Sequence, residues 1–215
     1  IPDLPKDNIE EMSDIILKSV DRQVMLTDDL LTLARLEAGR QEVNRRAMSL
    51  PQIISDIIHL YKTSAEKKGI KISRSIPSDI PEMMLDRNIM ATILTNLIGN
   101  AVKFTEPQGE INISVRLEGE EVILGVSDTG IGIPPDKLDR IFDRFYQVDM
   151  SSTRKYGGTG LGLSIVKEMV RLIEGDIRVE SELGKGTTFT VCFPYLPTEE
   201  SIISSFLSTQ IEELK

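Results

Sequence analysis

Three glycines alternate with other residues in the last third of the chain, at Gly158, Gly160 and Gly162. The apolar pattern of a helix begins at once, with Leu161 as its first member. Glycine allows positive φ and lets a ligand approach the backbone closely. The first N–H groups of a helix lack internal partners and lie at the positive end of its dipole. This turn, which includes Thr159, is therefore a candidate site for a polyphosphate anion, and the alternative is a simple helix cap.

A second glycine cluster lies upstream, where Asp128 is followed by Gly130 and Gly132. Alternating apolar residues before Asp128 predict a strand that ends at this carboxylate. A carboxylate at the floor of a pocket can accept a hydrogen bond from an exocyclic amine, such as that of adenine. The alternative is an aspartate that only forms the turn.

A stripe of polar residues lies along one face of the helix that is predicted over residues 87–105. Asn96, Asn100 and Lys103 are spaced by four and three residues, so they share one face. Asparagine is a poor residue for a helix interior. Mg²⁺ takes oxygen ligands, and a lysine adds a point charge for phosphate, so this stripe suits a magnesium–phosphate site. The alternative is a polar face that simply meets solvent.

Composition narrows the class of protein. The chain has 215 residues, of which 40% are hydrophobic and 27% charged, as is ordinary for globular proteins. Its formal net charge of −9 argues against a nucleic-acid partner. The single cysteine, Cys192, excludes a disulfide framework and a cysteine metal site. There is no apolar run long enough to span a bilayer and no signal peptide. Because the sequence starts at Ile1 without a methionine, we expect a piece of a longer protein.

The periodicity of apolar residues predicts the elements that position these groups. Helices are expected over residues 7–38, 50–67, 87–105 and 161–173, with a short one over 134–138. Strands are expected over residues 70–76, 111–117, 122–128, 177–181 and 187–193. Residues 147–157 have little apolar pattern and form a candidate lid, while residues 198–215 form a candidate amphipathic tail helix. His59 falls off the apolar face of its helix, so we expect it at the surface.

The first predicted helix, over residues 7–38, carries a wide apolar face and stops near Gly39. One interpretation is a helix that lies on the main domain. The other is one half of a helical hairpin whose second member is absent from this chain. We favour the hairpin, because the first few residues cannot supply partners for so wide a face.

Four stretches agree in order and spacing with one family. They read NLIGNAVKFT over residues 96–105, DTGIGIP over 128–134, IFDRFYQ over 141–147 and GTGLGLS over 158–164. Together with the GKGTTF stretch that ends at residue 189, they resemble the ATP-binding catalytic domain of sensor histidine kinases, in the gyrase, chaperone and histidine kinase ATPase superfamily. The resemblance covers about residues 48–195. Residues 30–39 look like the end of the second helix of that family's dimerisation and phosphoacceptor hairpin.

The resemblance implies an α+β fold, a two-layer α/β sandwich of the Bergerat type. A mixed sheet would carry helices on one face, and a long helix would precede it. The implied division is a partial dimerisation and phosphotransfer segment over residues 1–47, an ATP-binding catalytic domain over 48–196 and a C-terminal tail over 197–215.

The resemblance also implies roles within the site. Asp128 would recognise the adenine amine with help from Thr187. Asn100 would ligate Mg²⁺, while Asn96 and Lys103 would contact phosphates. The remaining members are the turn residues, most of them backbone donors, and the residues that border the nucleotide: Gly158, Thr159, Gly160, Leu161, Gly162, Gly130, Gly132, Tyr146 and Gln147.

The implied function is an ATP-dependent protein-histidine kinase. The γ-phosphoryl group would pass from ATP to a histidine on the missing hairpin helix, and then to an aspartate of a response regulator. The parent protein would be a homodimer and a membrane-anchored sensor. The part given by this chain would lie in the cytoplasm. No residue of this chain would be the phosphoacceptor, because His59 does not stand in the family's histidine box, so the chain should not phosphorylate itself. A second departure is Gln147, where some members carry an arginine.

Two other functions compete with the kinase. An ATPase like the gyrase and chaperone members would need a glutamate where Asn96 stands, because an amide cannot take a proton from water. A degenerate nucleotide-binding or scaffold module would act through its helix and tail, but the intact asparagine, aspartate and glycine positions count against it.

Overall fold

The computed structural model describes residues 6–148, 158–199 and 201. Within these residues the helices are α1 (Lys6–Glu37), α2 (Leu50–Lys68), α3 (Arg87–Phe104), the 3₁₀ helix η1 (Pro135–Arg140) and α4 (Gly162–Leu172). The strands are β1 (Arg46–Met48), β2 (Lys71–Ser75), β3 (Met83–Leu85), β4 (Glu110–Glu118), β5 (Glu121–Asp128), β6 (Asp176–Glu182) and β7 (Gly186–Pro194). Each helix and strand predicted within the described residues is confirmed, with bounds that shift by one or two residues at most ends.

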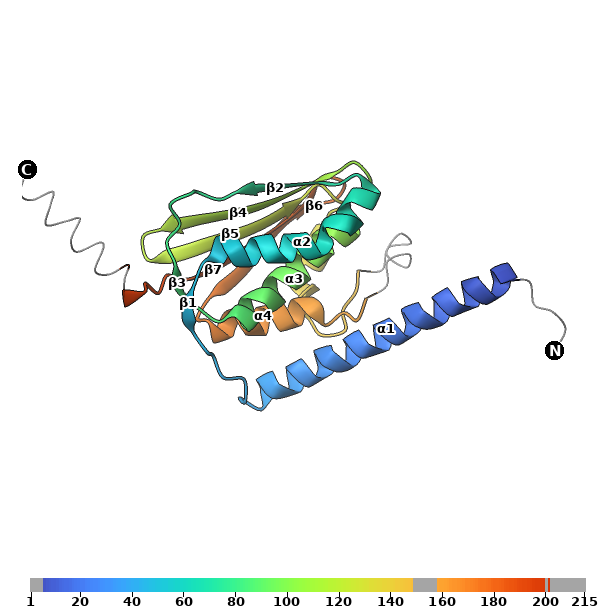
Figure 1. The fold of residues 1–215 in the computed structure, drawn as a ribbon, viewed down its shortest axis with the longest axis horizontal. Coiled ribbons are helices and arrows are strands. Elements are labelled where there is room, and N and C mark those ends of the chain that lie inside the picture. Colours follow the sequence, from blue (N-terminus) through green and yellow to red (C-terminus); the bar gives the residue numbers. More distant parts are fainter. Residues whose placement is uncertain (1–5, 149–157, 200, 202–215) are drawn as a thin grey trace, which may run out of the picture.

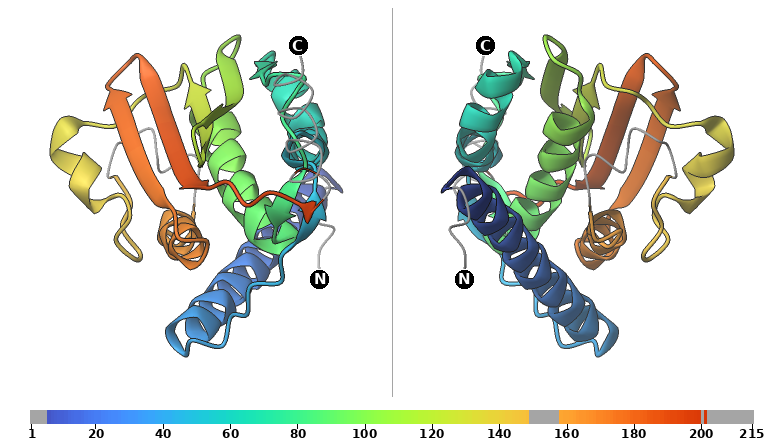
Figure 2. Two further views of the ribbon diagram at one scale, coloured as in Figure 1. Left: turned by 90° about the vertical axis from the view of Figure 1, so that its left-hand side faces the viewer. Right: turned by 90° about the vertical axis from the view of Figure 1, so that its right-hand side faces the viewer.

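Five strands form one sheet in the order β2-β4-β5-β7-β6. Strand β2 pairs in parallel with β4, and the other neighbours are antiparallel. Helices α2, α3 and α4 cover one face of this sheet, while the long helix α1 lies beyond α4 (Figure 1). The views in Figure 2 show the helical layer and the sheet as two separate layers. The expected mixed sheet with helices on one face is therefore confirmed.

Capping residues set the ends of the two central helices. The Ser49 side chain accepts a hydrogen bond from the N–H of Gln52 at the start of α2, and Gly69 ends that helix with a φ of 67°. Asp86 starts α3, because its carboxylate accepts hydrogen bonds from the N–H groups of Asn88 and Ile89. This cap fixes the residue at which α3 begins, and with it the face of the helix on which the polar stripe lies.

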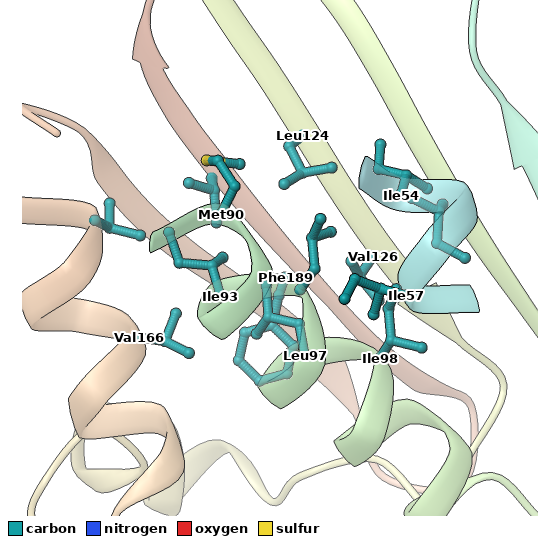
Figure 3. Packing of buried hydrophobic residues seen from close by; sticks show 14 of the residues in the cluster. Ile54, Ile57, Met90, Ile93, Leu97, Ile98, Leu124, Val126, Val166 and Phe189 are labelled. Carbon is teal, nitrogen blue, oxygen red and sulfur yellow. The ribbon is translucent and has the colours of Figure 1, made fainter. Parts of the chain in front are cut away.

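The core lies between α3 and the sheet. Ile93 of α3 is fully buried, and Figure 3 shows it among side chains from α2, α4 and the central strands. The labelled members of this cluster are Ile54, Ile57, Met90, Ile93, Leu97, Ile98, Leu124, Val126, Val166 and Phe189. Burying one such side chain contributes roughly 1.5–3 kcal/mol, so α3 is fixed mainly by its apolar face.

Helix α1 meets the domain near its C-terminal end. Leu33 is buried there, and an ion pair joins Glu37 to Arg144. Apolar side chains farther along the helix are exposed: Met12, Ile15, Ile16, Leu17, Val20, Val24, Met25, Leu30 and Leu31. The helix thus rests on the domain at one end and leaves much of its apolar face uncovered in this chain.

Two short strands were not predicted. Strands β1 and β3 pair antiparallel in a small second sheet, and Met83 forms a further bridge with Pro197. Each strand has three residues, which is too short for an alternating pattern to stand out. The candidate lid lies outside the described residues over 149–157, and so does nearly all of the candidate tail helix. In the part of the chain that the structure describes, no helix is both long and apolar enough to cross a bilayer.

We predict that Ile93→Ala lowers the free energy of unfolding by about 2–5 kcal/mol, because it opens a cavity at a fully buried position. Urea denaturation monitored by circular dichroism measures this loss. Leu60→Ala, at a position that is 68% exposed on α2, is the matched control and should change stability by about 0.5 kcal/mol or less. Equal losses in both variants would contradict this location of the core.

Candidate functional site

Asp128 ends strand β5 on the side of the sheet that the helices cover. Its Oδ1 accepts a hydrogen bond of 2.8 Å from the N–H of Gly130, and the backbone of Thr187 on β7 also donates to this carboxylate. Burial raises the pKa of Asp128 above its ordinary value, and the two backbone donors oppose that shift. The carboxylate is therefore held in place by backbone groups beside the helical layer.

The turn after Asp128 packs against the C-terminal end of α3. The N–H of Ile131 donates to the carbonyl of Phe104 at 3.2 Å. A Cβ placed on Gly130 would lie 2.5 Å from that same carbonyl oxygen, so only glycine fits this approach. Gly132 has a φ of 67°, and a Cβ there would lie 2.1 Å from the carbonyl oxygen of Glu182.

The other glycine cluster contacts the polar stripe of α3. A Cβ placed on Gly162 would lie 2.3 Å from Asn96 Oδ1, and one on Gly158 would lie 3.0 Å from Lys103 Nζ. The Asn96 Nδ2 group donates to the carbonyl of Thr92 at 2.9 Å, which turns its oxygen toward the glycine segment. The structure thus brings Asn96 and Lys103 together with the two ends of the glycine turn.

Helix α4 begins inside this glycine turn, and its N-cap residue, Leu161, makes no side-chain hydrogen bond to the first turn. The Thr159 hydroxyl accepts from the N–H of Leu161 at 3.2 Å and donates to Asp29 of α1 at 2.8 Å. The Gln147 side chain donates to the carbonyl of Gly158 at 2.9 Å. Gly160 has a φ of 72° and lies against the backbone of Phe145. Such an uncapped start leaves backbone donors for an anion.

The remaining candidates flank this arrangement. Asn100 is half-buried and lies one turn after Asn96 on the same face of α3. Tyr146 is half-buried, and the Arg140 guanidinium lies 4.3 Å from the centre of its ring. Thr187 is buried and pairs with Asp128 across the sheet.

The oxygen ligands at this site suffice for a magnesium ion only when phosphate oxygens complete its coordination. The described residues contain no group of three or more His, Cys, Asp or Glu side chains that could hold a metal ion. The Asn100 amide supplies one hard oxygen, and Mg²⁺ commonly takes one or two protein ligands and fills its octahedron with phosphate oxygens and water.

Three contacts that sequence reasoning missed support the site from behind. Lys68 of α2 donates to the carbonyls of Val102 and Lys103 at 2.8 and 2.9 Å, although burial lowers the pKa of its ammonium. Ser181 of β6 contacts Thr187 at 2.9 Å, and Asp29 bonds the glycine turn. The contacts of Lys68 and Asp29 join residues far apart in the chain, so no local pattern signals them, whereas Ser181 and Thr187 are six residues apart in the hairpin of β6 and β7.

A separate surface groove of about 290 Å³ lies between α2 and β2 and contains none of the candidate residues. His59 is one of its lining residues and is exposed, so its predicted surface position is confirmed.

A family model described as histidine kinase-, DNA gyrase B- and HSP90-like ATPase matches residues 85–197. This range holds α3, both glycine clusters and strands β4 to β7. The chain belongs to this ATPase family. Its fold is that of the histidine kinase catalytic domain, the ATP-binding domain type that the resemblance implied.

Two relatives and one solved structure illustrate the similarity. The autoinducer 2 sensor kinase/phosphatase LuxQ of Vibrio vulnificus is 39% identical over 87% of this chain and 22% of its own length. The sensor histidine kinase WalK of Bacillus subtilis is 37% identical over 84% of this chain and 30% of its own. The structure of full-length ShkA with AMPPNP has a TM-score of 0.77 at 32% identity, over 88% of this chain and 39% of that one. The chain therefore spans less than half the length of each of these proteins.

We predict that Gly132→Ala lowers the free energy of unfolding by about 2–4 kcal/mol, because its Cβ meets the carbonyl of Glu182 at a positive φ. The matched control is Gly119→Ala, which has a φ of 61° but nothing within 4 Å. That variant should lose only about 1 kcal/mol from backbone strain. Chemical denaturation of both variants separates the two effects, and equal losses would show that the turn is not packed this closely.

Proposed function

We propose that this chain binds ATP with Mg²⁺ and supplies the phosphoryl group of a protein-histidine kinase. One observation carries the proposal: α3 contacts both glycine clusters. The carboxylate of Asp128, a hydrogen-bond acceptor, and the start of α4, with its backbone N–H donors, therefore lie around the same helix. A base and a polyphosphate are the two chemical ends of a nucleotide, and these groups are complementary to them.

The base end of the site would be formed by Asp128 and Thr187. The ionised carboxylate only accepts hydrogen bonds, so it is matched to the donor amine of adenine. Gly132, at the neighbouring turn, and Tyr146 would border the base and sugar.

The phosphate end would be formed by the glycine turn and the stripe on α3. Backbone N–H groups of the turn from Gly158 to Gly162, which includes Thr159, would donate to phosphate oxygens, and the N–H of Leu161 would leave the Thr159 hydroxyl to do so. Lys103 and Asn96 would bond the phosphates from the opposite side. Asn100 would hold the magnesium ion, which neutralises charge on the phosphates when it is bound.

Gln147 is a difference from family members that carry arginine there. Its amide donates to the carbonyl of Gly158, so it braces the glycine turn and brings no positive charge. Charge neutralisation on the terminal phosphate would then rest on Lys103 and the metal.

The acceptor would be an imidazole on a helix outside this chain. The uncovered apolar face of α1 supports that partner, because such a face is stable in water only when another helix covers it. In this proposal residues 1–47 belong to a dimerisation and phosphotransfer hairpin, residues 48–196 form the ATP-binding domain and residues 197–215 form a tail.

The wider assembly follows from the same proposal. The parent protein would form a homodimer through the hairpin and would pass its phosphoryl group to a response-regulator receiver domain. The part of the parent that this chain represents would lie in the cytoplasm. Hydrolysis of ATP by this chain is disfavoured, because the group facing Gly162 is the amide of Asn96, which cannot act as a general base.

We predict that Asp128→Asn weakens Mg²⁺–ATP binding by about a hundredfold, because the variant places an amide N–H₂ where the base amine must donate (about 1.4 kcal/mol per tenfold). Isothermal titration calorimetry measures the affinity. The unfolding free energy near neutral pH should change by less than about 1 kcal/mol, since burial already disfavours the carboxylate. Glu180→Gln, at an exposed position on β6, is the charge-matched control and should bind ATP normally. Unchanged affinity in Asp128→Asn would refute this assignment of the base end.

The kinase activity is tested by mixing this chain with a fragment that bears the parent's first hairpin helix and with γ-labelled ATP. We expect label on the fragment that is stable in base and labile in acid, as a phosphohistidine is. ATP binding without transfer would leave a nucleotide-binding module and refute the kinase. Steady release of inorganic phosphate without label on the fragment would favour an ATPase.

A further inference from the structure

Three polar residues form one row across neighbouring strands at the base end of the site. Asp128 of β5 pairs with Thr187 of β7, and Thr187 pairs in turn with Ser181 of β6. On each strand, the residue two positions from the member of this row belongs to the core or packs on it. These residues are Val126 on β5, Phe189 on β7 and Val179 on β6. Because side chains alternate along a strand, the polar row faces the helical layer as well.

The hydrogens of this row can be assigned by counting. The Ser181 hydroxyl donates to the carbonyl of Gly186 at 2.8 Å and accepts from the N–H of Ile133 at 2.8 Å. Its oxygen also lies 2.9 Å from the Thr187 hydroxyl. A serine has one hydroxyl hydrogen, and that of Ser181 is directed to the carbonyl oxygen of Gly186. Thr187 must therefore donate to Ser181.

The consequence is a fixed polarity at Thr187. With its only hydrogen directed to Ser181, the Thr187 oxygen presents lone pairs, next to the Asp128 carboxylate that also only accepts when ionised. This part of the site therefore offers acceptors. The exocyclic amine of adenine donates and is matched to them, whereas guanine carries an acceptor oxygen at the equivalent ring position and is repelled.

We propose that Ser181 is a specificity-determining positioning residue, which orients the Thr187 hydroxyl and so favours ATP over GTP. This inference rests on the proposed ATP function. Ser181 acts through Thr187 and touches no reacting atom. Without Ser181 the Thr187 hydroxyl can rotate and donate to the guanine oxygen, so discrimination falls even though both side chains that face the base remain.

The test compares the dissociation constants of Mg²⁺–ATP and Mg²⁺–GTP by calorimetry. We expect Ser181→Ala to lower the ratio of the GTP constant to the ATP constant by about tenfold, the scale of one hydrogen bond. Ser181→Thr keeps the hydroxyl and should restore the ratio. Ser127→Ala is the matched control, because Ser127 makes the same kind of contact, 2.9 Å to Thr188, between β5 and β7. It should leave the ratio unchanged.

A double-mutant cycle distinguishes positioning from general loosening. Thr187→Val should lower the ratio by itself, and adding Ser181→Ala to it should lower the ratio no further. Equal weakening of both nucleotides by Ser181→Ala, with an unchanged ratio, would overturn the proposal. If Ser181→Ala does not fold, an unchanged ratio in Thr187→Val overturns it as well. Absence of ATP binding in the unsubstituted chain would instead refute the proposed function.

Discussion

Helix α3 is held at both of its ends, and the geometry of the candidate site depends on where that helix lies. At its start the buried carboxylate of Asp86 accepts hydrogen bonds from two N–H groups of the first turn. At its end the Lys68 ammonium donates to the carbonyls of Val102, Lys103 and Thr105. A carboxylate at the N-terminus and a cation at the C-terminus both complement the helix dipole. Together with the buried apolar face, they prevent α3 from sliding or rotating.

The two glycine clusters use this fixed helix as a common support. The turn after Asp128 approaches the backbone of Phe104, while the glycine turn before α4 approaches Asn96 and Lys103. Both approaches are closer than a Cβ would permit at Gly130 and Gly162. The spacing between the two clusters is thus set by α3 and not by the loops themselves. Loops alone could not hold two ends of a ligand site at a constant distance.

Sequence patterns were sufficient wherever the determining forces were local. The alternation in β4 and β5, the apolar face of α3 and the cap at Asp86 all act within a few residues, so their elements were predicted. Strand β3 was missed because its three residues, Met83 to Leu85, are too few for an alternating pattern to stand out. The contacts of Lys68 with the end of α3 and of Ser181 with the N–H of Ile133 were missed because they join residues far apart in the chain, which periodicity does not encode. Motif order identified the residues of the site, but only the fold shows what holds them.

Asp128, whose side chain is half-buried, is the residue that folding alone explains least. Burial raises its pKa, and the N–H groups of Gly130 and Thr187 offset that shift in part. A raised pKa means that the native chain binds this proton more tightly than the unfolded chain does. The favourable contribution of Asp128 is therefore present below its unfolded pKa and is lost as the pH rises through its folded pKa. Above its folded pKa, the ionised group contributes less to stability than the protonated group does below its unfolded pKa.

An asparagine would serve the turn equally well, because it tolerates the same backbone and keeps an oxygen acceptor. It would also present an N–H₂ group to whatever lies in the site. The carboxylate differs from that amide in its charge and in its hydrogen bonding, since the ionised group accepts on both oxygens and donates on neither. A carboxylate at a position where burial disfavours its charge, and where the neutral amide would fit the turn, is best explained by a donor on the ligand, and an exocyclic amine is such a donor.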